Sequence, residues 1–282
     1  MSSNPLPESP AMPYAAVNGT TLHYARAGAG TPALVFVHGF ACAHEDWREQ
    51  IDAFADRHAV VACDLRGHGA SPGDPAACSI DTYGADVAGL LAALDLTEVV
   101  LVGHSMGCRV VLQGYANAPE RIVGVALIDG SSMGTAGERA AETARATIAA
   151  GYADFIRPLF AQMFLAPGAE AERMIARALT LPEAIGAVLW PSMVDWDARR
   201  MTGALGSLRV PLLVIQSTAV SPERGRVPLA RGATSPWLEL VRRHAPRARI
   251  EIVPGVGHFA MLEAPDRVNA ALAALLARRG VR

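Results

Sequence analysis

The chain has 282 residues, and its 25 cationic side chains are all arginines because the sequence contains no lysine. This absence excludes Schiff-base catalysis, lysine-anchored pyridoxal phosphate and a Walker A phosphate loop, since each needs an amine that a guanidinium cannot replace. The formal net charge is −2, and no arginine cluster interleaves with aromatic residues, so neither nucleic acid nor a membrane surface is the expected partner. We expect a small-molecule substrate.

Residues 1–13 are rich in serine and proline and lack the basic segment and apolar run of a secretory signal. We expect a disordered tail here. No apolar stretch reaches the roughly 18 residues that span a bilayer. The four cysteines form no C-x-x-C pair, which indicates neither a metal site nor a disulfide framework. The sequence therefore predicts a cytoplasmic protein without a metal or other cofactor, and leaves its oligomeric state open.

The first predicted element is a β-hairpin, because residues 14–17 and 21–26 flank Asn18-Gly19, a dipeptide that tolerates positive φ at both positions. Short apolar runs typical of strands buried on both faces follow at 33–37, 60–63, 99–102, 123–128, 212–215 and 250–253. Helical patterns lie between them, clearest at 82–94, 107–118, 237–244 and 265–278. Alternating strands and helices predict an α/β fold with a mostly parallel sheet.

Residues 131–208 break this alternation. They contain no comparable apolar run but several amphipathic segments separated by prolines. We interpret this interval as a helical cap inserted over the sheet. The expected organisation is thus a core of residues 14–130 and 209–282, with a cap at 131–208.

The chemistry is concentrated at Gly103-His104-Ser105-Met106-Gly107, a G-x-S-x-G sequence between a predicted strand and a predicted helix. Such a strand-to-helix turn is sharp and strained, and bulky residues in place of Gly103 and Gly107 would collide with the adjacent backbone. The turn exposes the hydroxyl of Ser105 above the sheet. The N-terminus of the following helix would stabilise negative charge developing there.

A serine hydroxyl needs a nearby base to act as a nucleophile at neutral pH. His258 is the best placed of the 8 histidines, because it follows the last predicted strand in a loop containing glycines, at the edge where α/β sheets bind ligands. His104 is expected to pack beneath the serine, and His38 and His68 to fix local turns. The backbone N–H groups of Phe40, after the strand 33–37, and of Met106 are candidates for a two-donor oxyanion hole.

These motifs together resemble the α/β-hydrolase superfamily, and their order matches it from about residue 14 to residue 279. The resemblance rests on His38-Gly39-Phe40, on Asp64-Leu65-Arg66-Gly67-His68-Gly69, on the serine turn and on Gly257-His258-Phe259. It implies an eight-stranded sheet flanked by helices, with a helical cap after the sixth strand. It also implies Ser105 as nucleophile, His258 as base, and Phe40 and Met106 as oxyanion donors.

The sequence departs from this family at the acid. Family members usually carry an aspartate just beyond the seventh strand, where this chain has Val220. Asp129 ends the predicted sixth strand, and certain haloalkane dehalogenases carry their acid there. Asp129 is therefore the predicted acid, and Glu223, Asp197 or a dyad without an acid are the alternatives.

Two segments bear on the substrate. Trp190, Trp196, Met193 and Met163 of the predicted cap either line an apolar acyl pocket or dock the cap onto the core. The arginines within 221–237 either contact an acidic substrate or belong to an exposed loop with local salt bridges. The exposed loop is the favoured interpretation.

The leading functional hypothesis is an enzyme that hydrolyses carboxylic esters through an acyl-enzyme formed on Ser105. A lactonase, thioesterase, C–C bond hydrolase or cofactor-free perhydrolase using the same residues is an alternative. A ligand-binding protein without catalytic activity on the same fold is another.

Overall fold

The computed structural model describes residues 13–133, 137–166, 168–221 and 225–277. Its centre is an eight-stranded sheet in the order β1-β2-β4-β3-β5-β6-β7-β10. The strands are β1 Tyr14–Val17, β2 Thr20–Ala27, β3 Ala33–Val37, β4 Val60–Cys63, β5 Val99–His104, β6 Ile122–Ile128, β7 Leu212–Gln216 and β10 Arg249–Ile252. A two-stranded sheet, β8 Thr218–Val220 with β9 Arg226–Pro228, follows β7.

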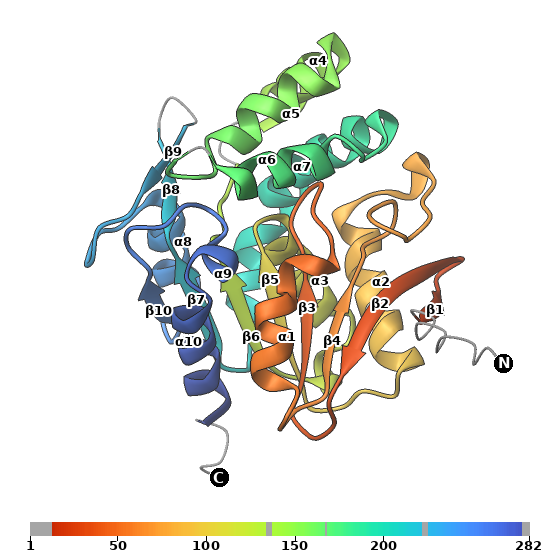
Figure 1. Cartoon of the computed structure of the whole chain (residues 1–282), viewed down its shortest axis with the longest axis vertical. Helices are drawn as coiled ribbons and strands as arrows, with labels where there is room; N and C mark the ends of the chain where they lie inside the picture. The colour runs from red at the N-terminus through yellow and green to blue at the C-terminus, as the bar shows by residue number, and fades with distance from the viewer. Residues whose placement is uncertain (1–12, 134–136, 167, 222–224, 278–282) are drawn as a thin grey trace, which may run out of the picture.

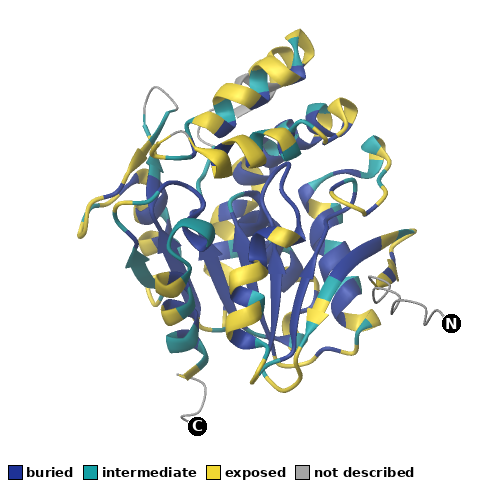
Figure 2. Ribbon diagram, in the orientation of Figure 1, coloured by how far each residue is buried: buried dark blue, intermediate teal, exposed yellow. Residues whose placement is uncertain are grey.

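In this sheet the six strands β4, β3, β5, β6, β7 and β10 run parallel to one another. Strands β1 and β2 form the antiparallel edge. The predicted hairpin is present, with φ of 39° at Asn18 and 74° at Gly19. The central strands β3 to β6 are almost wholly buried because helices cover both faces of the sheet (Figure 2). This α/β architecture confirms the predicted fold class.

Helices α1, α9 and α10 pack on one face of the sheet, and α2, α3 and α8 cover the other (Figure 1). Their bounds are α1 Arg48–Phe54, α2 Ile80–Ala93, α3 Met106–Asn117, α8 Pro236–His244, α9 Ala260–Glu263 and α10 Pro265–Ala277, and the short 3-10 helices are η1 His44–Trp47, η2 Pro75–Ala77 and η3 Pro119–Arg121. Local signals start several of them. The hydroxyls of Ser79 and Ser235 accept hydrogen bonds from the first turns of α2 and α8.

Four helices lie between β6 and β7, in the interval expected to form a cap: α4 Gly137–Ala150, α5 Tyr152–Ala161, α6 Ala169–Ala178 and α7 Glu183–Ser207. They lie over the edge at which the parallel strands end (Figure 1). Helix α7 also contacts α2, α3 and α8 of the layer behind the sheet. Among the described helices, none has the length and apolar character needed to cross a membrane.

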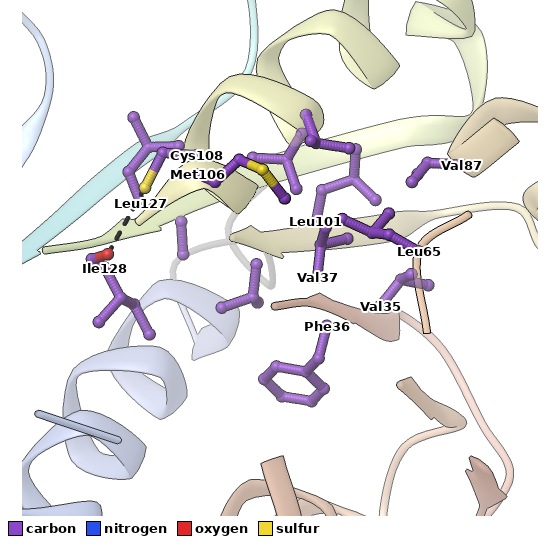
Figure 3. Close-up of a cluster of buried hydrophobic side chains, with 14 of the residues drawn as sticks. Val35, Phe36, Val37, Leu65, Val87, Leu101, Met106, Cys108, Leu127 and Ile128 are labelled. Carbon is purple, nitrogen blue, oxygen red and sulfur yellow. Dashed lines mark hydrogen bonds between the residues drawn. The ribbon is translucent and has the colours of Figure 1, made fainter. Parts of the chain in front are cut away.

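The core around the middle strands contains side chains from β3, β5, β6 and α3 (Figure 3). Leu101 of β5 has no exposed surface. It faces Gly114 of α3, where an added Cβ atom would lie 3.5 Å from Cδ1 of Leu101. The Sγ atom of Cys108 in α3 donates to the carbonyl of Ile128 in β6 at 3.5 Å. The strand and helix flanking Ser105 are therefore anchored to the sheet on both sides of the turn.

We predict that Leu101→Ala lowers the free energy of unfolding by about 2–5 kcal/mol, because it removes buried methyl groups and leaves a cavity under the Ser105 turn. Urea denaturation followed by circular dichroism measures the change. Leu165→Ala is the matched control, since Leu165 is 48% exposed, and it should cost less than about 0.5 kcal/mol. Equal losses in the two variants would contradict the placement of Leu101 in the core.

Candidate active site

Ser105 lies at the sharp turn between β5 and α3, with φ of 53° and ψ of −112°. This strained backbone is the conformation predicted from the G-x-S-x-G sequence. A Cβ atom at Gly103 would overlap the carbonyl of Gly107, and one at Gly107 would overlap the carbonyl of Val37. The two glycines are therefore required by the close approach of three backbone segments.

His258 follows β10 and its side chain is buried beside the carboxyl ends of the strands. Its Nδ1 atom lies 2.7 Å from Oδ2 of Asp129. No described residue is hydrogen-bonded to its Nε2 atom. Both His258 and Ser105 line one cavity. This arrangement leaves the second imidazole nitrogen available to exchange a proton with a group inside that cavity.

Asp129 is fully buried at the end of β6, in a backbone conformation with φ of 47°. Its Oδ1 atom accepts from the backbone N–H groups of Ser217 and Thr218, at 3.1 and 3.0 Å. Its Oδ2 atom accepts from the Thr218 hydroxyl at 2.7 Å in addition to contacting His258. Burial alone would raise the pKa of this carboxyl, but the bond to His258 and the other donors lower it on balance.

The alternative acids are differently placed. Glu223 lies outside the described residues. Asp197 is buried in α7, where it accepts two hydrogen bonds from the guanidinium of Arg109, at 2.8 and 2.6 Å. Asp129 is thus the carboxylate that contacts His258 in the described part of the chain, and Val220 occupies the cavity wall near the usual family position.

The residues predicted as oxyanion donors lie beside the serine. A Cβ atom at Gly39 would stand 3.2 Å from Cβ of Ser105, which shows how closely the loop after β3 approaches the turn. Phe40 and Met106 both line the cavity. Within the described residues, neither backbone N–H donates to a protein acceptor. These two donors are therefore available to an oxygen atom in the cavity.

His104 packs beneath this site, as expected. Its Nε2 atom lies 3.0 Å from the carbonyl oxygen of His258, and the two rings have centroids 4.6 Å apart. Complete burial holds the pKa of His104 well below its usual value. His38 spans the neighbouring turns, since Nδ1 contacts the carbonyl of Gly39 and Nε2 accepts from the N–H of Leu65. Both histidines are thus neutral structural groups.

The cavity has a volume of about 590 Å³ and extends between the strand ends and the cap helices. Three of the four cap residues singled out in the sequence line it, namely Met163, Trp190 and Met193. Trp196 does not. Its indole N–H donates to Gln113 of α3 at 3.0 Å, so this residue attaches α7 to the core. The wall is mainly apolar, and it also contains polar side chains from the core, the cap and the segment after β8.

Arg226 is a lining residue, which the favoured interpretation of 221–237 as an exposed loop does not predict. Its side chain points inward from β9, and only 11% of it is exposed. Its Nη1 atom donates to the Thr218 hydroxyl at 3.0 Å and lies 3.9 Å from Oδ2 of Asp129. Arg231, by contrast, is exposed. A three-residue strand carries too little periodicity to distinguish the two from sequence.

The alpha/beta hydrolase family matches residues 34–271. The chain belongs to this family. A relative from Pseudomonas putida, the dihydrolipoyllysine-residue acetyltransferase component of an acetoin cleaving system, is 29% identical over 95% of this chain and 70% of its own. A non-heme chloroperoxidase from Streptomyces lividans is 39% identical over 39% of this chain and 41% of its own.

Among solved structures, a hydrolase from Pseudomonas aeruginosa PA01 superimposes with a TM-score of 0.80. It is 22% identical in sequence and covers 95% of this chain and 99% of its own. This likeness supports the α/β-hydrolase fold. The family match supports a hydrolase activity on a small molecule for this member of the alpha/beta hydrolase family.

The electrostatics of His258 give a testable prediction. Burial, and then the positive charge of Arg226, lower the pKa of His258 to about 4, against the raising effect of Asp129. Replacing the cation in Arg226→Gln removes one cause of the lowering, so the pKa of His258 should rise. An NMR titration of the imidazole measures the midpoint, with Arg231→Gln as the control that should not move it. A wild-type midpoint at or above the ordinary value of about 6.5 would contradict this account.

Proposed function

We propose that this chain is a serine hydrolase of carboxylic esters, with Ser105 as nucleophile, His258 as base and Asp129 as acid. One observation carries the proposal. His258 Nδ1 contacts Asp129, and Nε2 has no hydrogen-bond partner among the described residues, on the wall of the cavity that Ser105 also lines. An imidazole so oriented is the group that a serine hydroxyl needs for activation.

In the proposed first step, Oγ of Ser105 attacks the ester carbonyl and its proton passes to Nε2 of His258. The carbonyl oxygen becomes an oxyanion that accepts hydrogen bonds from the N–H groups of Phe40 and Met106. Asp129 stabilises the imidazolium formed at this moment, because its Oδ2 faces Nδ1. The carbon–oxygen bond then breaks, and the departing alkoxide takes the proton from Nε2.

The second step releases the acyl group. A water molecule gives a proton to Nε2 and attacks the acyl-enzyme carbonyl, and the same two backbone N–H groups receive the oxyanion. Collapse of this intermediate returns the proton to Oγ of Ser105 and frees the carboxylic acid. Every group in this cycle is a hydroxyl, an imidazole, a carboxylate or a backbone donor of this chain.

A fluorophosphonate probe tests the nucleophile. We expect it to label wild-type protein at Ser105, found by peptide mass spectrometry, and p-nitrophenyl esters to be turned over. Ser105→Ala should lose both. Folded wild-type protein that neither labels nor hydrolyses an ester of any acyl length, a lactone or a thioester would overturn the proposal, and would favour a ligand-binding role without catalysis.

Substitution of Asp129 tests its proposed role as the acid. Asp129→Asn should lower kcat by about 10⁴-fold, because the amide no longer stabilises the imidazolium and favours the wrong imidazole tautomer. Glu223→Gln is the matched control and should retain near wild-type kcat. Steady-state kinetics on one p-nitrophenyl ester measure both, with circular dichroism to verify folding. The opposite ranking would assign the acid to Glu223.

A further inference from the structure

Arg226 places a cation in the wall of the proposed active-site cavity, and the proposed mechanism does not use it. The residue begins β9, directly beside β8, and its backbone N–H donates to Oε1 of Gln162 at 3.2 Å. Its side chain is nearly nine-tenths buried. Burial lowers its pKa, but a guanidinium remains protonated in proteins. A permanent positive charge therefore lies in the same cavity as Ser105 and His258.

The protein compensates this charge only in part. A guanidinium carries five N–H donors. In the described residues, the Arg226 side chain makes one hydrogen bond, from Nη1 to the Thr218 hydroxyl at 3.0 Å. The nearest carboxylate among the described residues, Asp129, is 3.9 Å from Nη1 and already receives bonds from His258, Ser217 and Thr218. The edge formed by Nε and Nη2 has no described acceptor.

The other charged side chains in the cavity wall differ from Arg226. Arg109 makes a two-point contact with Asp197 and also donates to the Ser131 carbonyl at 3.0 Å, so its charge is matched. Asp154 of α5 is exposed, where water and salt screen it. Among the described residues, Arg226 is consequently the buried cation of the cavity wall that has more N–H donors than protein acceptors.

We propose that the Nε–Nη2 edge of Arg226 binds a carboxylate of the substrate, and hence that the substrate class is an ester bearing a free carboxylate group. The planar fork of a guanidinium matches the two oxygens of a carboxylate, and such charge-assisted pairs are short and strong. The cavity volume of about 590 Å³ lies within the range of small-molecule sites, which leaves room for both the ester and the anionic group. This inference rests on the proposed esterase function.

Matched substrate pairs test the inference. One pair carries the charge on the acyl side, p-nitrophenyl hydrogen glutarate against p-nitrophenyl pentanoate. The other carries it on the leaving group, p-acetoxybenzoate against its methyl ester. For wild-type protein we expect kcat/KM to be about tenfold or more higher for the anionic member of at least one pair. The difference should lie mainly in KM, because one charge-assisted hydrogen bond strengthens binding by about this factor.

Variants of Arg226 distinguish substrate binding from a structural role at Thr218. Arg226→Gln should reduce the anionic-to-neutral ratio to one or below, and Arg226→Lys should retain part of it because the charge remains. Arg231→Gln, an exposed arginine of the same loop, should keep the wild-type ratio. A purely structural role at Thr218 would lower both members of a pair equally and leave the ratio unchanged, which would overturn the inference.

A measurement on unaltered protein removes dependence on the folding of the variants. Hydrolysis of p-nitrophenyl pentanoate by wild-type protein should be inhibited at least about tenfold more strongly by p-hydroxybenzoate than by p-hydroxybenzamide if the charge pairs with Arg226. Equal inhibition would count against the site. Labelling of Ser105 together with turnover of neutral esters, but no preference in either pair, would refute the carboxylate site while leaving the esterase proposal intact.

Discussion

The hydrogen bond between His258 Nδ1 and Asp129 Oδ2 joins two strand ends that are distant in the sequence but close in the sheet. β6 and β10 both pair with β7, so the residues that follow them emerge at the same edge. An ionised carboxylate without partners would be expensive at this depth. The loop after β7 lowers that cost, because Ser217 and Thr218 direct three donors at Asp129.

This arrangement gives the loop after β7 a changed part in the site. In the commoner family pattern that loop supplies the acid, whereas here it supplies three donors to Asp129, the acid that we propose at the end of β6. The Thr218 hydroxyl donates to Asp129 and accepts from Arg226, which connects the carboxylate to the cation in one chain of hydrogen bonds. The side chains of Asp129 and Arg226 are therefore both held by Thr218.

The helices between β6 and β7 complete the site from above. The carbonyl of Met163 accepts from the backbone N–H of His258 at 2.6 Å, so the segment after α5 fixes the histidine loop directly. The Arg109–Asp197 pair links α3, which starts at the serine turn, to α7. Breaking a buried pair of this kind leaves an uncompensated charge. The cavity shape and the serine turn are consequently coupled through α3 and α7.

Much of this could be predicted from sequence because the signals are local. Apolar runs indicate the central strands, Asn18-Gly19 indicates the hairpin, and G-x-S-x-G indicates the sharp turn at Ser105, because each of these patterns can be read from a few consecutive residues. Val220 stands where family members usually carry the acid, which favours Asp129 for that role. The separate sheet of β8 and β9 and the helix α1 gave no usable pattern, because three to seven residues carry little periodicity.

What only the tertiary structure decided is which side chains meet: that Asp129 faces His258, that Trp196 docks α7 while Trp190 lines the cavity, and that Arg226 points inward. Those outcomes depend on strand order and on packing between separate segments, such as Asp129 with His258 and Trp196 with Gln113, which the amino-acid order does not display.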